Sequence, residues 1–147
     1  MYYLIIAACF CIAIAIVDLI TYRIPDILLI SFAIVMIILI GRQPYNVLIL
    51  RLVASAVSFL LFGAVWYFTK GIGFGDVKFA AVLGYLLGPG RLAYAFIATA
   101  LLGFIVYLIG MKIFRWSKTK KIPYAPFLSS GAIVSLFINN NLIGGLM

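Results

Sequence analysis

The chain has 147 residues, of which 67% are hydrophobic, and its mean hydropathy is +1.30. Only 10% of the residues are charged, against roughly 25% in a soluble globular domain, which excludes an ordinary soluble protein. The long apolar runs lack the alternation of a transmembrane β-barrel. We therefore expect an all-α, polytopic membrane protein with about six transmembrane helices in a single domain, residues 1–147.

Six apolar segments are predicted to be helices, and polar or glycine- and proline-containing stretches separate them. In chain order they are Tyr2–Tyr22, Ile27–Ile40, Val47–Phe68, Val77–Leu87, Leu92–Phe114 and Phe127–Ile143. The fourth is short: at a rise of ~1.5 Å per residue it spans ~15 Å, about half of the hydrocarbon core. We expect the preceding "GIGFGD" loop to dip below the membrane surface, where irregular backbone must be buried in protein or line a wet cavity.

The net charge of +8 is carried by basic residues between the apolar runs, where they set topology and contact anionic lipids. No basic soluble face is present, so we expect no nucleic-acid partner. Three basic residues follow segments two and four, namely Arg42, Arg51 and Arg91. Eight follow segments one, three and five, namely Arg23, Lys70, Lys78, Lys112, Arg115, Lys118, Lys120 and Lys121. The positive-inside rule predicts a multi-pass protein of the inner (cytoplasmic) membrane, with the second set in the cytoplasm and both termini outside.

The sequence has only three acidic residues, Asp18, Asp26 and Asp76. Asp26 follows Pro25 before an apolar run, so we expect it to cap the next helix; an active-site role is the alternative. Asp18 lies inside the first segment, where a carboxylate faces the protein interior or a water-filled cavity; a polar packing contact is the alternative. Asp76 lies at a predicted helix start, which favours a negative group.

The expected topology places Asp18 and Asp76 on the same side of the membrane, which indicates a pair of carboxylates. Two such groups a few ångströms apart share a proton. One can then take a proton from water while the other donates to a peptide carbonyl oxygen. The sequence has no His, and Cys9 and Cys11 lie within an apolar run. We therefore expect neither Ser–His chemistry nor a metal site, and no cofactor.

Three stretches together resemble the type IV prepilin peptidases, aspartyl proteases with a GxGD motif. "GFGDVK" (Gly73–Lys78) resembles the GxGDxK signature of that family. "DLITYRIPD" (Asp18–Asp26) is similar to the segment of its first aspartate, and "KIPYAPFLSSGA" (Lys121–Ala132) to its C-terminal motif. The three occur in the family's order and extend over nearly the whole chain.

The resemblance implies that Asp18 and Asp76 are the catalytic pair, facing the cytoplasm, and that Gly73, Gly75 and Lys78 support the second aspartate. The implied reaction removes the short basic leader of prepilin or prepilin-like proteins at the membrane border. Membrane lipids and this protein substrate are the expected partners, and the oligomeric state is left open.

The chain departs from the resemblance at two positions, since Ala125 stands where glycine is usual and Asp26 where asparagine is usual. Many members also carry a cysteine-bearing cytoplasmic loop and methylate the new N-terminus, and we find no room for that loop. We therefore expect a peptidase without N-methyltransferase activity, of the short form found with Flp or tight-adherence pili. The alternatives are an archaeal-type preflagellin peptidase, a small transporter or proton pathway that uses the same aspartates, and a non-catalytic assembly factor.

Overall fold

The computed structural model of the chain describes residues 2–69, 71–112 and 123–137. Within these ranges it has five helices and no strand, which confirms the all-α prediction. The helices are α1 (Tyr2–Thr21), α2 (Asp26–Ile40), α3 (Tyr45–Thr69), α4 (Phe74–Lys112) and α5 (Ala125–Phe137).

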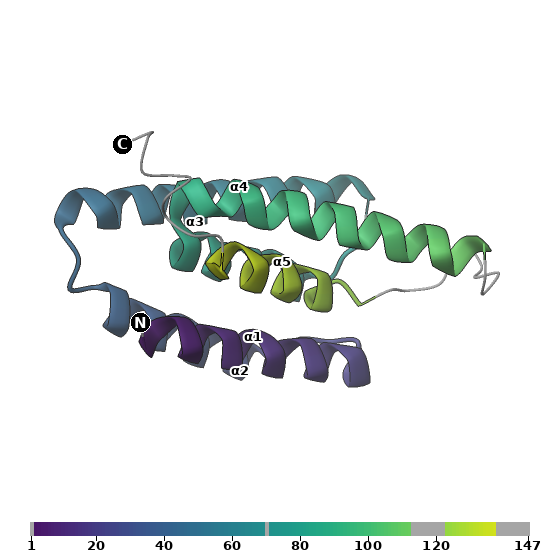
Figure 1. Cartoon of the computed structure of the whole chain (residues 1–147), viewed down its shortest axis with the longest axis horizontal. Helices are drawn as coiled ribbons and strands as arrows, with labels where there is room; N and C mark the ends of the chain where they lie inside the picture. The colour runs from purple at the N-terminus through teal and green to yellow at the C-terminus, as the bar shows by residue number, and fades with distance from the viewer. Residues whose placement is uncertain (1, 70, 113–122, 138–147) are drawn as a thin grey trace.

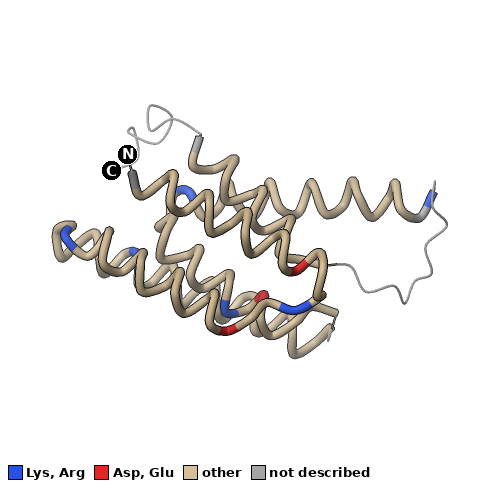
Figure 2. Tube along the Cα trace, turned by 90° about the horizontal axis from the view of Figure 1, so that it is seen from below, with Lys and Arg blue, Asp and Glu red and all other residues tan. Residues whose placement is uncertain are grey.

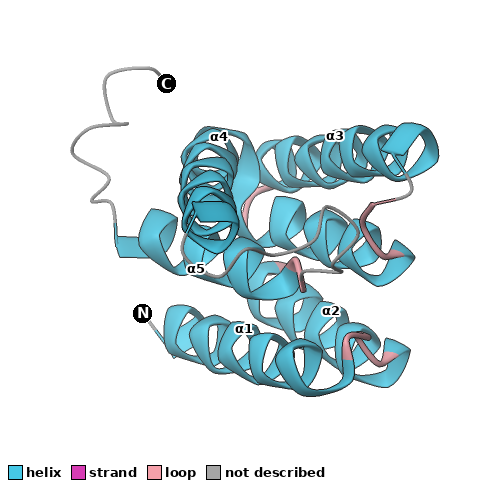
Figure 3. Cartoon of the chain, turned by 90° about the vertical axis from the view of Figure 1, so that its right-hand side faces the viewer, coloured by secondary structure: helices cyan, strands magenta, loops and turns pink. Residues whose placement is uncertain are grey.

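The helices pack as a layered bundle with α5 at its centre (Figures 1 and 3). Helices α1 and α2 lie side by side on one side, and α3 lies with α4 on the other. Helix α5 contacts both α1 and α4, so it joins the two layers. Elements from opposite ends of the sequence therefore become neighbours.

Helix α4 contains the break that the sequence placed between two separate helices. Gly88 has φ 70° and ψ 175°, and Pro89 follows it. Positive φ is open to glycine, and proline cannot donate to the preceding turn, so the helical axis kinks here. The expected loop at "GPGR" is replaced by this kink, and the predicted fourth and fifth segments are the two arms of α4.

The expectation of about six membrane helices is not confirmed. Three described helical stretches are long and apolar enough to cross a membrane, namely Tyr3–Thr21, Tyr45–Thr69 and Phe74–Gly110. Helices α2 and α5 are apolar but shorter. The count differs partly because the kink at Gly88 joins two expected helices into one element.

The interior of the bundle is built from close contacts between apolar side chains. The rings of Phe10 and Phe32 stack with centroids 5.0 Å apart, and Phe32 meets Phe79 at 6.4 Å. A Cβ atom at Gly131 of α5 would lie 2.5 Å from the carbonyl oxygen of Ala95, so this glycine allows α5 to approach α4. Small residues at such crossings are typical of membrane helices, where packing replaces the hydrophobic effect between helices.

Helix α1 ends because Tyr22 takes a left-handed conformation, with φ 52°. Its N–H still donates to the carbonyl oxygen of Asp18, at 2.8 Å. A residue in this conformation after the last turn terminates a helix. The chain then turns through Pro25 into α2, so the start of α2 follows closely on the end of α1.

Candidate active site

The acidic residues gather at one end of the bundle (Figure 2). Asp18 lies in the last turn of α1, Asp26 is the first residue of α2, and Asp76 lies in the first turn of α4. Asp18 and Asp76 are 58 positions apart in the sequence. The fold nevertheless brings them close enough for their carboxylates to interact electrostatically.

Asp18 is buried, with 5% of its surface exposed. The N–H of Ala125, at the start of α5, donates to its Oδ2 at 3.1 Å. Helix α5 is held against α1 one turn later, where the Ser129 hydroxyl donates to the carbonyl oxygen of Cys11 at 2.9 Å. A free N–H at a helix start is a natural partner for a carboxylate. The C-terminal motif therefore contacts Asp18 through a backbone hydrogen bond rather than through a side chain.

Asp76 is also buried, with 7% of its surface exposed. The N–H of Gly73 donates to its Oδ2 at 3.0 Å, and its own N–H donates to the carbonyl oxygen of Gly73 at 3.1 Å. The first of these two bonds is the backward half of a capping box, in which the side chain at the third helical position accepts from the N–H of the cap residue. Oδ1 of Asp76 is buried without a hydrogen-bond partner among the described residues. One oxygen thus holds the side chain against Gly73, and the other makes no hydrogen bond to a described residue.

Gly75 allows the two aspartate-bearing segments to approach. A Cβ atom at this position would lie 3.2 Å from the Cβ of Ile24, in the turn that follows α1. A side chain here would push that turn away from the start of α4. Gly73 and Gly75 therefore have separate roles beside Asp76: Gly73 donates a hydrogen bond and Gly75 leaves space.

Asp26 and Lys78 form an ion pair, with 2.8 Å between Nζ of Lys78 and Oδ1 of Asp26. The expectation that Asp26 caps α2 is wrong, because Pro25 occupies the cap position and no side-chain cap hydrogen bond forms. The carboxylate turns instead to Lys78, whose Nζ also lies 5.3 Å from the centroid of the Phe74 ring. Lys78 therefore links α4 to the first turn of α2, and these contacts are with Asp26 and Phe74 rather than with Asp18 or Asp76.

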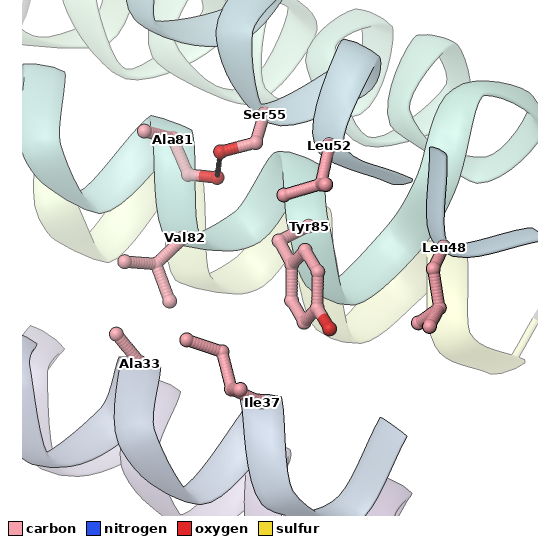
Figure 4. Close-up of a pocket in the computed structure, with 8 residues that line it drawn as sticks. All are labelled: Ala33, Ile37, Leu48, Leu52, Ser55, Ala81, Val82 and Tyr85. Atoms are coloured by element: carbon pink, nitrogen blue, oxygen red, sulfur yellow. Dashed lines mark hydrogen bonds between the residues drawn. The ribbon is translucent and has the colours of Figure 1, made fainter. Parts of the chain in front are cut away.

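A cavity in the described structure lies away from this pair of carboxylates. It has a volume of about 390 Å³ and lies among α2, α3 and α4, where Ala33 and Ile37 face Val82 and Tyr85 (Figure 4). Its α4 residues, Ala81, Val82 and Tyr85, follow Asp76 by five, six and nine positions. At about 100° per residue, they lie roughly 140–240° around the helix from Asp76. This cavity therefore opens on the opposite face of α4.

The sequence could not have identified the N–H of Ala125 as the partner of Asp18, because a backbone donor leaves no residue signature. The only sequence signal for this hydrogen bond was the C-terminal motif that contains Ala125. The unpartnered Oδ1 of Asp76 and the cavities likewise depend on packing.

Two buried carboxylates with one backbone donor each can share a proton, activate water and polarise a carbonyl group. Among the described residues, no three His, Cys, Asp or Glu side chains form a metal-binding group.

Comparison with known proteins gives a consistent result. A model described as the type IV leader peptidase family matches residues 5–108. A prepilin leader peptidase/N-methyltransferase of Bacillus subtilis (strain 168) is 31% identical over 93 residues, which are 63% of this chain and 38% of that protein. One of the same name from Xanthomonas campestris is 26% identical over 151 residues, covering 97% of this chain and 52% of that protein. The chain thus spans about half, or less, of the length of these relatives. No solved structure matches significantly.

Proposed function

This chain belongs to the type IV leader peptidase family, and on that premise we propose that it is an integral membrane aspartyl endopeptidase for the leaders of type IV prepilin-like proteins. One observation carries the proposal. Asp18 and Asp76, from distant helices, are buried at one end of the bundle within electrostatic reach of each other. Burying two carboxylates together costs free energy. A shared proton lowers that cost, and a catalytic role would account for keeping both groups buried side by side.

The proposed reaction is hydrolysis by water without a covalent enzyme intermediate. The ionised carboxylate takes a proton from water, whose oxygen attacks the peptide carbon while the protonated carboxylate donates to the carbonyl oxygen. The C–N bond then breaks, the amine receives a proton, and the pair returns to its singly protonated state. Oδ1 of Asp76, which has no partner among the described residues, is the atom best placed to exchange a proton with water.

We propose that the two carboxylates face the cytoplasm from the inner membrane, with both termini outside. Arg42 follows α2 and Arg51 lies in α3, so both belong to the end of the bundle opposite the aspartates. Arg23 and Lys78 lie at the aspartate end. The positive-inside rule then depends largely on Lys70, Arg115, Lys118, Lys120 and Lys121, which lie outside the described residues.

We further propose that the chain performs the peptidase step without N-methylation. The names of the relatives combine the two activities. The two carboxylates provide for hydrolysis and offer nothing specific to methyl transfer. The N-terminus of the cleaved product distinguishes the two outcomes, because its mass reveals a free or a methylated amine.

The test is leader removal from a co-expressed prepilin-like protein, followed as a mobility shift. We expect Asp18→Asn and Asp76→Asn each to lower cleavage on the order of 10²–10⁴-fold, the usual contribution of a general acid or base. Asp26→Asn is the matched control, because its carboxylate is exposed and paired with Lys78. Membrane levels of each variant are measured in parallel.

Orientation is read in the same preparation. Inverted membrane vesicles should cleave an added substrate, whereas right-side-out vesicles should not. Full cleavage by both asparagine variants at positions 18 and 76 would contradict the proposed mechanism. Cleavage by right-side-out vesicles alone would reverse the proposed topology.

A further inference from the structure

The cavity of about 390 Å³ among α2, α3 and α4 takes no part in the proposed reaction (Figure 4). We propose that it is the binding site of one anionic phospholipid, with an acyl chain in the cavity and the phosphate at Arg51. The inference goes beyond the proposed function, because it concerns the end of the bundle opposite Asp18 and Asp76 and requires no peptide substrate.

The walls of the cavity suit an acyl chain. Apart from Ser55 and Tyr85, its lining side chains are apolar, namely Ala33, Ile37, Leu48, Leu52, Ala81 and Val82. The Ser55 hydroxyl donates within the protein, to the carbonyl oxygen of Ala81 at 2.8 Å (Figure 4). Ile37 and Leu52 are 55% and 59% exposed, so the cavity opens on the outer surface of the bundle, where lipid lies. Its volume also falls within the ~300–1,000 Å³ of small-molecule sites.

Arg51 lies at the edge of this cavity. Its Nη1 donates to the carbonyl oxygen of Tyr85 at 3.0 Å, and Tyr85 forms part of the cavity wall. Leu48 and Ser55, also on the wall, lie three positions before and four positions after Arg51, on the same face of α3. The hydrogen bonds of Arg51 to described residues involve only Nη1. Of its other two nitrogens, Nε is enclosed and Nη2 is not, so Nη2 can donate to an anion.

This end of the bundle carries positive charge, and no acidic side chain lies there. Arg42 lies in the turn between α2 and α3, and Arg91 follows the kink of α4 within electrostatic reach of Arg51. The three acidic residues of the sequence all lie at the opposite end (Figure 2). The positive-inside rule gives no reason for arginines at this end, which the proposed topology places outside. A phosphate group complements this charge, because a guanidinium forms strong, directed hydrogen bonds with phosphate oxygens.

The surroundings of Arg51 place it at the depth of lipid headgroups. It is the seventh residue of α3, so it lies only ~9 Å along the helix from Tyr45. Tyr3, near the start of α1, lies within electrostatic reach of Arg51, and tyrosine is typical of the membrane–water interface. A phosphate beside Arg51 would therefore lie at the interface. The acyl chain would extend toward Ser55, one helical turn deeper in α3.

The test identifies lipids retained by the intact protein, using native mass spectrometry. Protein in mild detergent is incubated with equal amounts of phosphatidylglycerol and phosphatidylcholine that have the same acyl chains. We expect one phosphatidylglycerol to be retained in preference to phosphatidylcholine. Arg51→Gln should lower this preference about tenfold or more, because a charge-assisted hydrogen bond is lost. Arg42→Gln should lower it about fivefold, the usual effect of one basic side chain near a membrane surface.

Arg23→Gln is the control for the arginine variants. It removes the same charge from an exposed residue at the aspartate end and should leave the preference unchanged. Arg42→Gln keeps the test informative if Arg51→Gln fails to fold, since Arg42 is exposed in a turn. Circular dichroism checks the helical content of each variant.

A second set of variants tests the place of the acyl chain. Ala33→Phe fills the cavity from α2 and should lower retention of phosphatidylglycerol about tenfold, as apolar pockets discriminate by size. Ile37→Trp fills it from an exposed position and should have the same effect. Ala56→Phe adds the bulk of Ala33→Phe at an exposed residue of α3 outside the cavity and should change nothing.

Three outcomes would overturn the proposal. Equal retention of the two lipids, or equal losses in Arg42→Gln and Arg23→Gln, would show that no anionic lipid is selected at this end. Unchanged retention in both filling variants would show that the acyl chain does not enter the cavity. A lipid-free mass of two chains that the filling variants abolish would assign the cavity to a second copy of this chain. Leader cleavage is measured separately, so the lipid site and the peptidase proposal can each fail alone.

Discussion

At each end of the first arm of α4, a charged side chain forms hydrogen bonds with backbone groups at that end of the helix. The two charges are opposite in sign. At its start, Asp76 accepts a hydrogen bond from the free N–H of Gly73. At its end, before the break at Gly88, Arg51 of α3 donates from Nη1 to the carbonyl oxygens of Tyr85, at 3.0 Å, and Leu86. Each charge thus lies at the end of a helix dipole that favours it.

The ends differ in what their charged groups can do. Each group keeps one buried atom without a partner among the described residues, Oδ1 of Asp76 and Nε of Arg51. A guanidinium does not give up its proton in proteins, so Arg51 can only hold structure. A carboxylate beside a second carboxylate can exchange a proton, so the aspartate end can react. Similar packing therefore yields a structural end and, under the proposed function, a reactive end.

The largest expected effect on cleavage comes from a substitution that displaces the two aspartates without changing them. Gly75→Leu places a side chain where Ile24 already lies, because even a Cβ atom would be 3.2 Å from the Cβ of Ile24. The turn after α1 must shift, and Asp18 with it. We expect leader cleavage to fall about 10²-fold, since a displacement of ~1 Å costs that much in a catalytic site.

Gly103→Leu is the matched control for this change. It lies in the second arm of α4, and a Cβ atom there would meet no atom within 4 Å. Cleavage and thermal stability should be retained, because leucine favours the helix more than glycine does. Unchanged cleavage by Gly75→Leu would show that the close approach at Ile24 does not set the distance between the aspartates.

At the structural end, Arg51→Met should lower stability and spare the reacting groups. The carbonyl oxygens of Tyr85 and Leu86 would lose their donor, and an unsatisfied buried polar group costs about 1–3 kcal/mol. We expect the free energy of unfolding in detergent to fall by about 2–3 kcal/mol, with cleavage per folded molecule retained. Thermal unfolding followed by circular dichroism, together with the cleavage assay, measures both quantities.

Arg42→Met removes the same charge at the same end from an exposed residue just after α2. It should leave the unfolding free energy within about 0.5 kcal/mol of the unaltered protein. An equal loss of stability in both arginine variants would mean that net charge, rather than the contact at the kink, stabilises this end.

The smallest effect should come from the Asp26–Lys78 ion pair at the aspartate end. Its side chains are 61% and 38% exposed, respectively, and exposed pairs contribute about 0–1 kcal/mol. A double-mutant cycle of Asp26→Asn and Lys78→Met, read by thermal unfolding, should give a coupling energy in that range and retained cleavage. Loss of cleavage in Lys78→Met with the fold intact would instead give Lys78 a part in the reaction.

Local sequence signals predicted helix boundaries well where glycine or proline clearly interrupts an apolar segment. The predicted segment Ile27–Ile40 differs by one residue from α2, Asp26–Ile40. The break after Leu87 was also predicted, since Gly88 and Pro89 disfavour a continuous helix, but its form was not. A kink and a loop have the same glycine and proline signals, and the contact of Arg51 with the preceding turn accompanies the kink.

The sequence by itself determined the apolar all-α character, the few charges and the identity of the two buried aspartates as candidates. These follow from composition, periodicity and the cost of a carboxylate inside an apolar segment. Only the tertiary structure decided that Ala125 and Gly73 donate to those aspartates, and that Asp26 pairs with Lys78 instead of capping α2. The physical reason is that backbone donors and cavities depend on how the helix ends pack against one another. No residue type by itself specifies that packing.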